Sequence, residues 1–324
     1  TTSCTDALEM AALLLHTEPG DEIIAPSYTF VSTVNAFVLR GAKIVFTDSS
    51  AESPNIDVTK IEELITPKTK AILPVHYAGI ACDMDVIMDI ANRHKVYVVE
   101  DAAQSIDAYY KGRPLGSIGQ LSAFSFHETK NIISGEGGML VMNDPSFIQR
   151  AEIIREKGTN RSAFFRGEIN KYGWVDIGSS FLPSEIIAAF LFAQLENMNK
   201  IQAKRKFSWE TYHDALKPLA AKGYFKTPFI PAYATNNAHI YYIVCNTPDD
   251  RQRLIAELKK EEIYSVFHYL SLHKSEFYKD KYNGPELPNS DHFSDCLIRL
   301  PMFYDLSEKE IIQVVKVIKK FYNG

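Results

Sequence analysis

The stretch VYVVEDAAQS, residues 96–105, decides the fold class of this chain. Its first half is apolar and rich in valine, which is typical of a strand buried on both faces of a sheet. Asp101 follows that strand directly. Because ligands of open α/β sheets bind at the carboxyl ends of the strands, Asp101 is the first candidate for a functional site.

Segments of the same kind recur on both sides of residues 96–105. The further predicted strands are Glu22–Ala25, Lys43–Thr47, Lys70–Val75, Leu121–Phe126 and Gly138–Met142. The helical patterns that alternate with them are Thr5–His16, Ser32–Leu39, Val58–Ile65 and Asp83–His94. This alternation predicts an α/β fold, with a mixed, mostly parallel sheet flanked by helices.

The pattern changes after about residue 205. Ser184–Arg205 has apolar residues near helical spacing and predicts one long helix. Beyond it, a single strand at Ile240–Cys245 lies among helices predicted at Lys206–Ala215, Asp249–Glu261 and Lys309–Phe321. A chain of 324 residues is long enough for two domains. We therefore expect a large α/β domain over residues 1–205 and a smaller C-terminal α+β domain over residues 206–324.

Composition excludes several classes of function. A net charge of −5, with no basic stretch among aromatics, argues against a nucleic-acid partner. No apolar run reaches the roughly 20 residues that span a bilayer, so membrane insertion is not expected. The nine histidines show no metal-binding spacing, so no metal is expected. Four cysteines without CxxC pairs fit a reducing cytoplasm.

Two charged side chains follow adjacent predicted strands. The carboxylate of Asp101 could hold the protonated nitrogen of a pyridine ring, and it could equally cap a helix. Lys130 lies in the loop after Leu121–Phe126. A lysine held there, with its amine partly buried, suits Schiff-base chemistry, whereas a lysine taken alone is more often a solvated surface residue. The glycine-rich run Gly135–Gly138 after it is also a plain turn sequence.

Three other segments end strands or begin helices. Ser3, Cys4 and Thr5 open the first helix, where free N–H groups form either an anion site or an ordinary cap. Tyr28 and Phe30 follow the strand Glu22–Ala25, where an aromatic side chain either stacks on a flat ring or belongs to the core. His76 follows Lys70–Val75 and is either a ligand contact or a structural histidine.

The order and spacing of these segments resemble the nucleotide-sugar aminotransferases of the aspartate-aminotransferase fold type, across essentially the whole chain. The segments that carry the resemblance are SCTDALEMAALLL, PSYTFVSTVNAFVLRGA, PVHYAG, VVEDAAQS, FSFHETKN and GEGG. The resemblance implies the PLP-transferase fold type I and pyridoxal 5′-phosphate (PLP) as cofactor. It implies that Lys130 is the Schiff-base lysine. The implied cofactor contacts are Cys4, Thr5, Phe30, Asp101, Gln104, Ser125 and Ser180, where Asp101 pairs with the pyridinium nitrogen and Phe30 stacks on the ring.

Residues 156–181, together with VFHYLSLH near Phe267, are similar to the family members that make dTDP-4-amino-4,6-dideoxygalactose for lipopolysaccharide or enterobacterial common antigen. This implies transfer of an amino group from L-glutamate to C4 of dTDP-4-keto-6-deoxy-D-glucose. Another nucleotide-linked keto-sugar and a non-catalytic ligand-binding role stay as alternatives. A dehydratase is disfavoured because those relatives have histidine in place of Lys130. The candidate substrate residues are Tyr28, His76, Lys157, Asn160, Arg161, His268 and Tyr269.

The chain departs from the family pattern in two places. Many relatives carry Asn and Arg at the positions of Ser180 and Leu182, and the Asn reaches the cofactor phosphate of the neighbouring subunit. Ser180 can still donate a hydrogen bond, so we expect a homodimer with shared active sites. Leu182 cannot hold a charge, so the carboxylates of glutamate must be recognised elsewhere. Relatives also have several tens of residues before the position of Thr1, which predicts that an N-terminal segment is missing here.

Overall fold

A six-stranded sheet forms the centre of the computed structural model, which describes residues 1–323. Its strand order is β2-β1-β3-β4-β7-β8. The first five of these strands run parallel, and β8 is antiparallel to β7. The predicted mixed, mostly parallel sheet is therefore confirmed. Its strands are β1 (Glu22–Pro26), β2 (Lys43–Thr47), β3 (Thr69–Ile72), β4 (Tyr97–Asp101), β7 (Leu121–Ser125) and β8 (Gly138–Met142).

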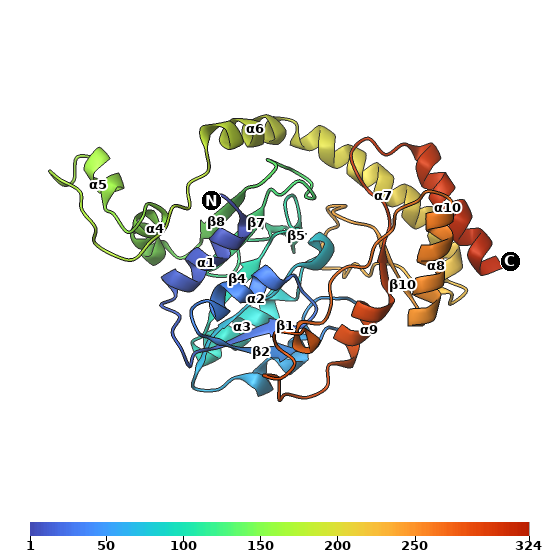
Figure 1. The fold of residues 1–324 in the computed structure, drawn as a ribbon, viewed down its shortest axis with the longest axis horizontal. Coiled ribbons are helices and arrows are strands. Elements are labelled where there is room, and N and C mark those ends of the chain that lie inside the picture. Colours follow the sequence, from blue (N-terminus) through green and yellow to red (C-terminus); the bar gives the residue numbers. More distant parts are fainter. Residues whose placement is uncertain (324) are drawn as a thin grey trace.

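Helices cover both faces of this sheet (Figure 1). Successive side chains of a strand point to opposite faces, so Ile23 packs into the core on one side and Ile24 into the core on the other. The core around Ile23 includes residues of α1 (Cys4–Leu14), α2 (Val31–Val38) and α4 (Ile148–Arg155). The core around Ile24 includes residues of α3 (Met84–His94). A strand buried on both faces reads as a continuous apolar run, as the sequence showed.

A second, three-stranded antiparallel sheet lies to the right in Figure 1. Its strands are β9 (Phe225–Lys226), β10 (Tyr242–Cys245) and β11 (Leu297–Arg299). A separate hydrophobic core joins it to α7 (Met198–Ala220), α8 (Pro248–Lys260) and α10 (Glu308–Asn323), and α9 (Pro288–Cys296) contributes to another. The domain boundary between residues 205 and 206 stays a prediction, since α7 runs continuously through it.

The long helix expected at Ser184–Arg205 is two helices. α6 (Glu185–Glu196) ends at Asn197, and α7 begins at the next residue. The Asn197 side chain donates a hydrogen bond to the carbonyl of Ala193 at 2.9 Å. Asparagine competes in this way with the backbone for hydrogen bonds, which favours a break in the helix.

The helix expected at Val58–Ile65 is wrong. The segment forms two short 3₁₀ turns, Val58–Lys60 and Glu62–Leu64. Neither turn has a buried residue, and only Ile61 between them is fully buried. Pro67 restricts the residue before it, so the segment cannot grow into a longer helix.

A segment from the C-terminal part of the chain lies against β2, the edge strand of the large sheet. The backbone N–H of Ile44 donates to the Tyr278 hydroxyl at 2.8 Å, and that hydroxyl lies 3.2 Å from the Ile44 carbonyl oxygen. The ring of Tyr278 also packs on Phe46, with centroids 5.0 Å apart. Further along, Asp48 accepts backbone hydrogen bonds from Asn289 and Ser290. The two sheets are thus joined along this edge.

Candidate active site

A cavity of about 550 Å³ lies at the carboxyl ends of β1, β4 and β7, where the sequence placed the site. Residues of the small sheet and its loops close it from the other side: His239, His268, Tyr269 and Arg299. The structure brings nine of the predicted site residues to this wall: Cys4, Thr5, Phe30, Asp101, Gln104, Ser125, Lys130, His268 and Tyr269.

Lys130 stands on the loop that follows β7. Its backbone N–H donates to the His127 carbonyl at 2.9 Å, which closes a turn and fixes the lysine at the cavity wall. Burial lowers the pKa of the Lys130 amine, while the nearby Cys4 and Asp101 act in the opposite direction. A lysine in such surroundings loses its proton more readily than a solvated one, as an amine nucleophile requires.

Asp101 is the last residue of β4 and is 5% exposed. Its Oδ2 accepts a hydrogen bond from the Thr33 hydroxyl at 2.6 Å, and its Oδ1 accepts from the backbone N–H of Ala103 at 3.1 Å. No Lys, Arg or His side chain of residues 1–323 forms a salt bridge with it. The carboxylate is therefore held in one orientation at the cavity wall, with room for a cationic partner.

The first turn of α1 forms another part of the wall, through Ser3, Cys4 and Thr5. Ser3 caps the helix by accepting from the N–H of Asp6 at 3.0 Å, and the remaining first-turn N–H groups have no partner within the helix. A Cβ added at Gly138 would lie 2.2 Å from the carbonyl oxygen of Ser3. Glycine there lets β8 approach α1 closely. The helix N-terminus with its hydroxyl side chains is suited to an anion such as a phosphate.

Aromatic and amide groups complete the cavity. Phe30 is 53% exposed, and its ring centroid lies 5.9 Å from that of Tyr269. The Gln104 side chain donates to the Tyr269 hydroxyl at 3.0 Å and accepts from the backbone N–H of Ala78 at 2.6 Å. An exposed ring, a buried carboxylate, a lysine and a helix N-terminus therefore meet in one cavity. They match the ring, ring nitrogen, aldehyde and phosphate of PLP, so the residues present fit this cofactor.

The structure does not bring Tyr28 and His76 into the cavity. Both are buried, with exposed fractions of 1% and 0%. Tyr28 donates to the backbone carbonyl of His268, and so supports the wall from behind. The Nδ1 atom of His76 accepts from the backbone N–H of Cys82 at 3.2 Å, while its Nε2 donates to Glu100 at 2.9 Å.

Glu100 anchors the strand end that carries Asp101. Its carboxylate accepts backbone hydrogen bonds from Gly116, Ile118 and Gly119, at 2.7–2.8 Å, in addition to the one from His76. Burial alone raises the pKa of Glu100, but His76 and these N–H groups outweigh it and hold the pKa below its usual value of 4.5.

We expect Glu100→Gln to lower the free energy of unfolding at pH 7 by about 1.5–3 kcal/mol, since an amide cannot accept all four hydrogen bonds. A lowered pKa means that this stabilisation is present above pH 4.5 and is lost as the pH falls through the folded-state value. The gap in melting temperature between wild type and variant should therefore be constant near neutral pH and narrow in acid. Glu63→Gln, at an exposed site, is the control. A gap that stays constant in acid would contradict this role.

Four other predicted residues lie outside the cavity, on the segment that projects at the left of Figure 1. Ser180 is exposed and pairs with Glu156 in an isolated bridge. Lys157 and Arg161 are also exposed, and the Asn160 side chain accepts from the backbone N–H of Gly173 at 2.8 Å. Within one chain, the structure brings none of them to the cavity wall.

Thr33, His239 and Arg299 line the cavity, but our sequence analysis did not identify them. Thr33 carried a signal, because hydroxyl residues recur in the helix that follows β1. His239 and Arg299 carried none, since they come from segments more than a hundred residues away whose positions only the fold reveals. Burial lowers the pKa of His239, so this histidine is neutral.

Three negative findings apply to the described residues. Among residues 1–323, no helix is long and apolar enough to span a membrane. No group of three or more His, Cys, Asp or Glu side chains in that range is arranged to hold a metal ion. All four cysteines are free.

Comparison with known proteins finds relatives that are named as aminotransferases. A family model described as the DegT/DnrJ/EryC1/StrS aminotransferase family matches residues 1–319. The UDP-4-amino-4-deoxy-L-arabinose–oxoglutarate aminotransferase of Shewanella sediminis is 34% identical over 98% of this chain and 84% of its own length. An aminotransferase structure from Psychrobacter cryohalolentis is 30% identical, with a TM-score of 0.93, over 100% of this chain and 86% of that one. A putative sugar aminotransferase of Streptococcus pneumoniae, in its PLP form, has a TM-score of 0.91 at 26% identity over 99% of this chain and 86% of its own.

Proposed function

Because the chain belongs to the DegT/DnrJ/EryC1/StrS family and is thus a PLP-dependent sugar aminotransferase, we propose a specific reaction for it. It transfers the amino group of L-glutamate to C4 of dTDP-4-keto-6-deoxy-D-glucose. The products are dTDP-4-amino-4,6-dideoxygalactose and 2-oxoglutarate. The C4 carbonyl oxygen is replaced by the amino group, and glutamate becomes the keto acid, so no outside oxidant or reductant is needed.

The observation that supports transamination best is the pairing of Lys130 and Asp101 in one cavity. Burial lowers the pKa of the Lys130 amine, and Asp101 is a carboxylate held by Thr33, without a salt bridge to any of residues 1–323. Transamination needs both groups, because one must move protons and the other must hold a positive charge on the cofactor ring.

PLP, when bound, withdraws electrons from the carbon that gives up its proton. Asp101 then holds a proton on the ring nitrogen, and the Thr33 hydroxyl keeps the carboxylate turned toward it. The first turn of α1 binds the phosphate through its free N–H groups, with Cys4, Thr5 and Ser125 around it. Phe30 and Gln104 also line the cavity, where Phe30 would stack on the ring and Gln104 would contact the ring hydroxyl.

Lys130 moves the proton. With PLP bound, the amine of Lys130 would take the proton from the α-carbon of glutamate, and in the second half-reaction it would give a proton to C4 of the sugar. Two half-reactions that share one site predict ping-pong kinetics.

The choice of sugar rests on residues 156–181 and on VFHYLSLH, which are similar to the enzymes that make dTDP-4-amino-4,6-dideoxygalactose. The decisive experiment incubates holoenzyme with dTDP-4-keto-6-deoxy-D-glucose and L-glutamate and reads the product by NMR. The spectrum shows whether the C4 proton is equatorial or axial, and this distinguishes the galacto amine from the gluco amine. The gluco amine would replace the proposed product with its C4 epimer, and amination only of a UDP-linked keto-sugar would replace the proposed substrate. For the proposed product, surface glycan synthesis is the proposed use, and the cytoplasmic location stays a prediction.

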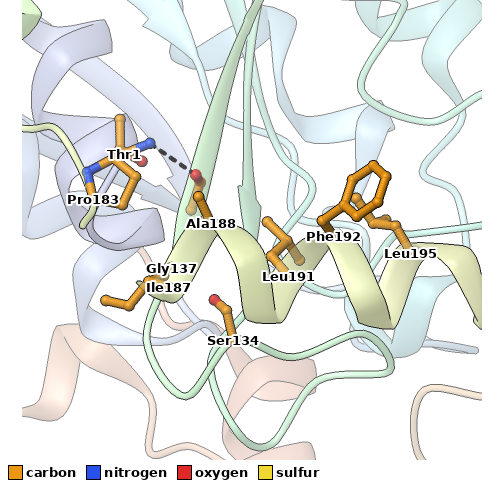
Figure 2. A pocket seen from close by; sticks show the side chains of 10 residues that line it. Thr1, Ser134, Gly137, Pro183, Ile187, Ala188, Leu191, Phe192 and Leu195 are labelled. Atoms are coloured by element: carbon orange, nitrogen blue, oxygen red, sulfur yellow. Dashed lines mark hydrogen bonds between the residues drawn. The ribbon is translucent and has the colours of Figure 1, made fainter. Parts of the chain in front are cut away.

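A homodimer with shared active sites completes this proposal. α6 is almost entirely apolar, yet none of its residues is buried within one chain. Ile186 is 82% exposed and Phe192 is 64% exposed. Figure 2 shows α6 beside a small groove, where Leu191 and other apolar side chains line the wall. An apolar helix left uncovered on the surface is typical of a subunit interface. A second copy of this chain is its proposed partner.

Replacing Phe192 with Asp should weaken this dimer. Burial of one phenylalanine stabilises by about 1.5–3 kcal/mol, and a twofold interface contains two of them. We therefore expect the dimer dissociation constant to rise by roughly 10² or more. Light scattering over a range of protein concentrations measures it. Ile312→Asp, on the exposed face of α10, is the control for adding a charge at an apolar surface residue. A Phe192→Asp protein that is as dimeric as wild type would rule out this helix as the interface.

A further inference from the structure

Arg299 is mounted rigidly at the end of β11. Arg299 pairs with Tyr242 of β10 in the small sheet, and its backbone N–H donates to the Val266 carbonyl at 2.8 Å. The Val266 N–H in turn donates to the Arg299 carbonyl at 3.3 Å. A side chain that starts from a fixed backbone position loses less freedom when it binds a ligand, so this arginine is well placed to recognise one.

The guanidinium of Arg299 has no acceptor in the described part of the chain. Neither a hydrogen bond nor a salt bridge joins it to any of residues 1–323, although the side chain is more than half covered. Arg205 and Lys130 are close enough that the positive charge of Arg299 lowers the pKa of both by repulsion. A partly buried cation with five donors and no acceptor is costly unless an anion joins it.

Arg299 stands where two cavities meet. It lines the cofactor cavity and a second cavity of about 540 Å³, and Lys130 and Thr129 line both as well. Arg299 and the lysine that is expected to move the substrate proton therefore face the same two cavities. An anion bound there is close to the reacting carbon.

We propose that Arg299 binds the α-carboxylate of the amino donor, and the same carboxylate of the 2-oxoglutarate that leaves. This deepens the proposed function and rests on it. In glutamate the α-carboxylate is attached to the same carbon that loses its proton to Lys130. A cation beside Lys130 is therefore where this group must lie. The diphosphate of a sugar nucleotide is attached at C1, across the ring from the reacting C4, and so lies farther from the lysine.

The other cations near the site are already in use. Arg205 donates from Nε to the Ala238 carbonyl at 3.1 Å and also to the carbonyl of His239. Burial lowers the pKa of His268 to about 2, so this histidine offers no charge. Leu182 is apolar, where many relatives have arginine. His127 also lines the cavity, but it lies 3.5 Å from the Glu136 carboxylate. Of the arginines and lysines that line the cofactor cavity, Lys130 is assigned to proton transfer, so Arg299 is left for a carboxylate, and its planar fork suits bidentate binding.

The test separates donor binding from the rest of the reaction. Holoenzyme is mixed with increasing L-glutamate, and the loss of the PLP absorbance band gives an apparent dissociation constant for the first half-reaction. Calorimetry with 2-oxoglutarate on the PLP form, which has no amino group to transfer to a keto acid, and with dTDP, gives binding without turnover. For Arg299→Gln we expect at least a tenfold weaker affinity for glutamate and 2-oxoglutarate, with dTDP affinity within twofold of wild type. Arg299→Lys should recover part of the loss, because it keeps the charge.

Arg253→Gln is the matched control, an exposed arginine of the small domain that pairs only with Asp249. If wild type responds normally and Arg299→Gln keeps its affinity for glutamate and 2-oxoglutarate, the role of Arg299 is overturned and the proposed function is not. Loss of dTDP affinity instead overturns that role in favour of a phosphate contact. A wild-type band that does not respond to glutamate overturns the proposed donor, and the role of Arg299 with it.

Discussion

Lys130→Ala holoenzyme should show no measurable amino transfer. Loss of proton transfer alone costs roughly 10²–10⁴-fold in rate, and the loss of the covalent attachment to PLP adds to this. The variant should also lack the visible absorption band of a lysine-bound cofactor. Stopped-flow spectroscopy with glutamate and a coupled assay for 2-oxoglutarate measure the two effects.

The control for Lys130→Ala is Lys68→Ala, which removes an exposed lysine just before β3. Its rate and spectrum should equal those of wild type. Addition of a small primary amine should restore part of the proton transfer in Lys130→Ala, since the cavity then holds an amine again. If Lys130→Ala transaminates at a rate near wild type, another residue moves the proton and the site has been misassigned.

Asp101→Asn should be folded and bind PLP, but turn over at least 10²-fold more slowly, which corresponds to about 2.7 kcal/mol in the barrier. Asparagine has nearly the same shape and can still accept from Thr33, so the wall should keep its geometry. Without the negative charge, the ring nitrogen loses its proton and the ring becomes a poorer electron acceptor.

Thr33→Val provides the comparison for Asp101→Asn. It removes the hydroxyl that donates to Asp101 and keeps the carboxylate charge. We expect a smaller loss of rate, roughly tenfold, from an unpaired carboxylate oxygen that costs about 1–3 kcal/mol. If the two variants lose rate equally, orientation and not charge is what Asp101 contributes.

The sequence predicted the large sheet well because its strands are buried on both faces. Continuous apolar runs such as residues 96–100 identify such strands, and the polar residues that follow them mark the edge where ligands bind. Asp101 and Lys130 were found in this way. Local patterns were less reliable where one side chain decided the outcome, as at Asn197, whose amide breaks a helix that the apolar spacing continues.

The part of the cavity formed by the small sheet could not be predicted. β11 is three residues long, too short for a periodic signal, and Arg299 stands at its end. Its closeness to Lys130 depends on how the two sheets pack, which is a property of the whole fold. Tyr28 and His76 show the reverse difficulty, because a position after a strand does not reveal whether a side chain turns toward the cavity or behind its wall.

The contact of Tyr278 with β2 has a consequence for how the protein behaves in a crowded solution. An edge strand presents unpaired N–H and C=O groups that can recruit a strand of another chain, and such recruitment leads to aggregation. At Ile44 both groups lie within hydrogen-bonding distance of the Tyr278 hydroxyl, so this stretch of β2 is closed to strand addition. The side chain that anchors this C-terminal segment to β2 thus also keeps neighbouring molecules apart.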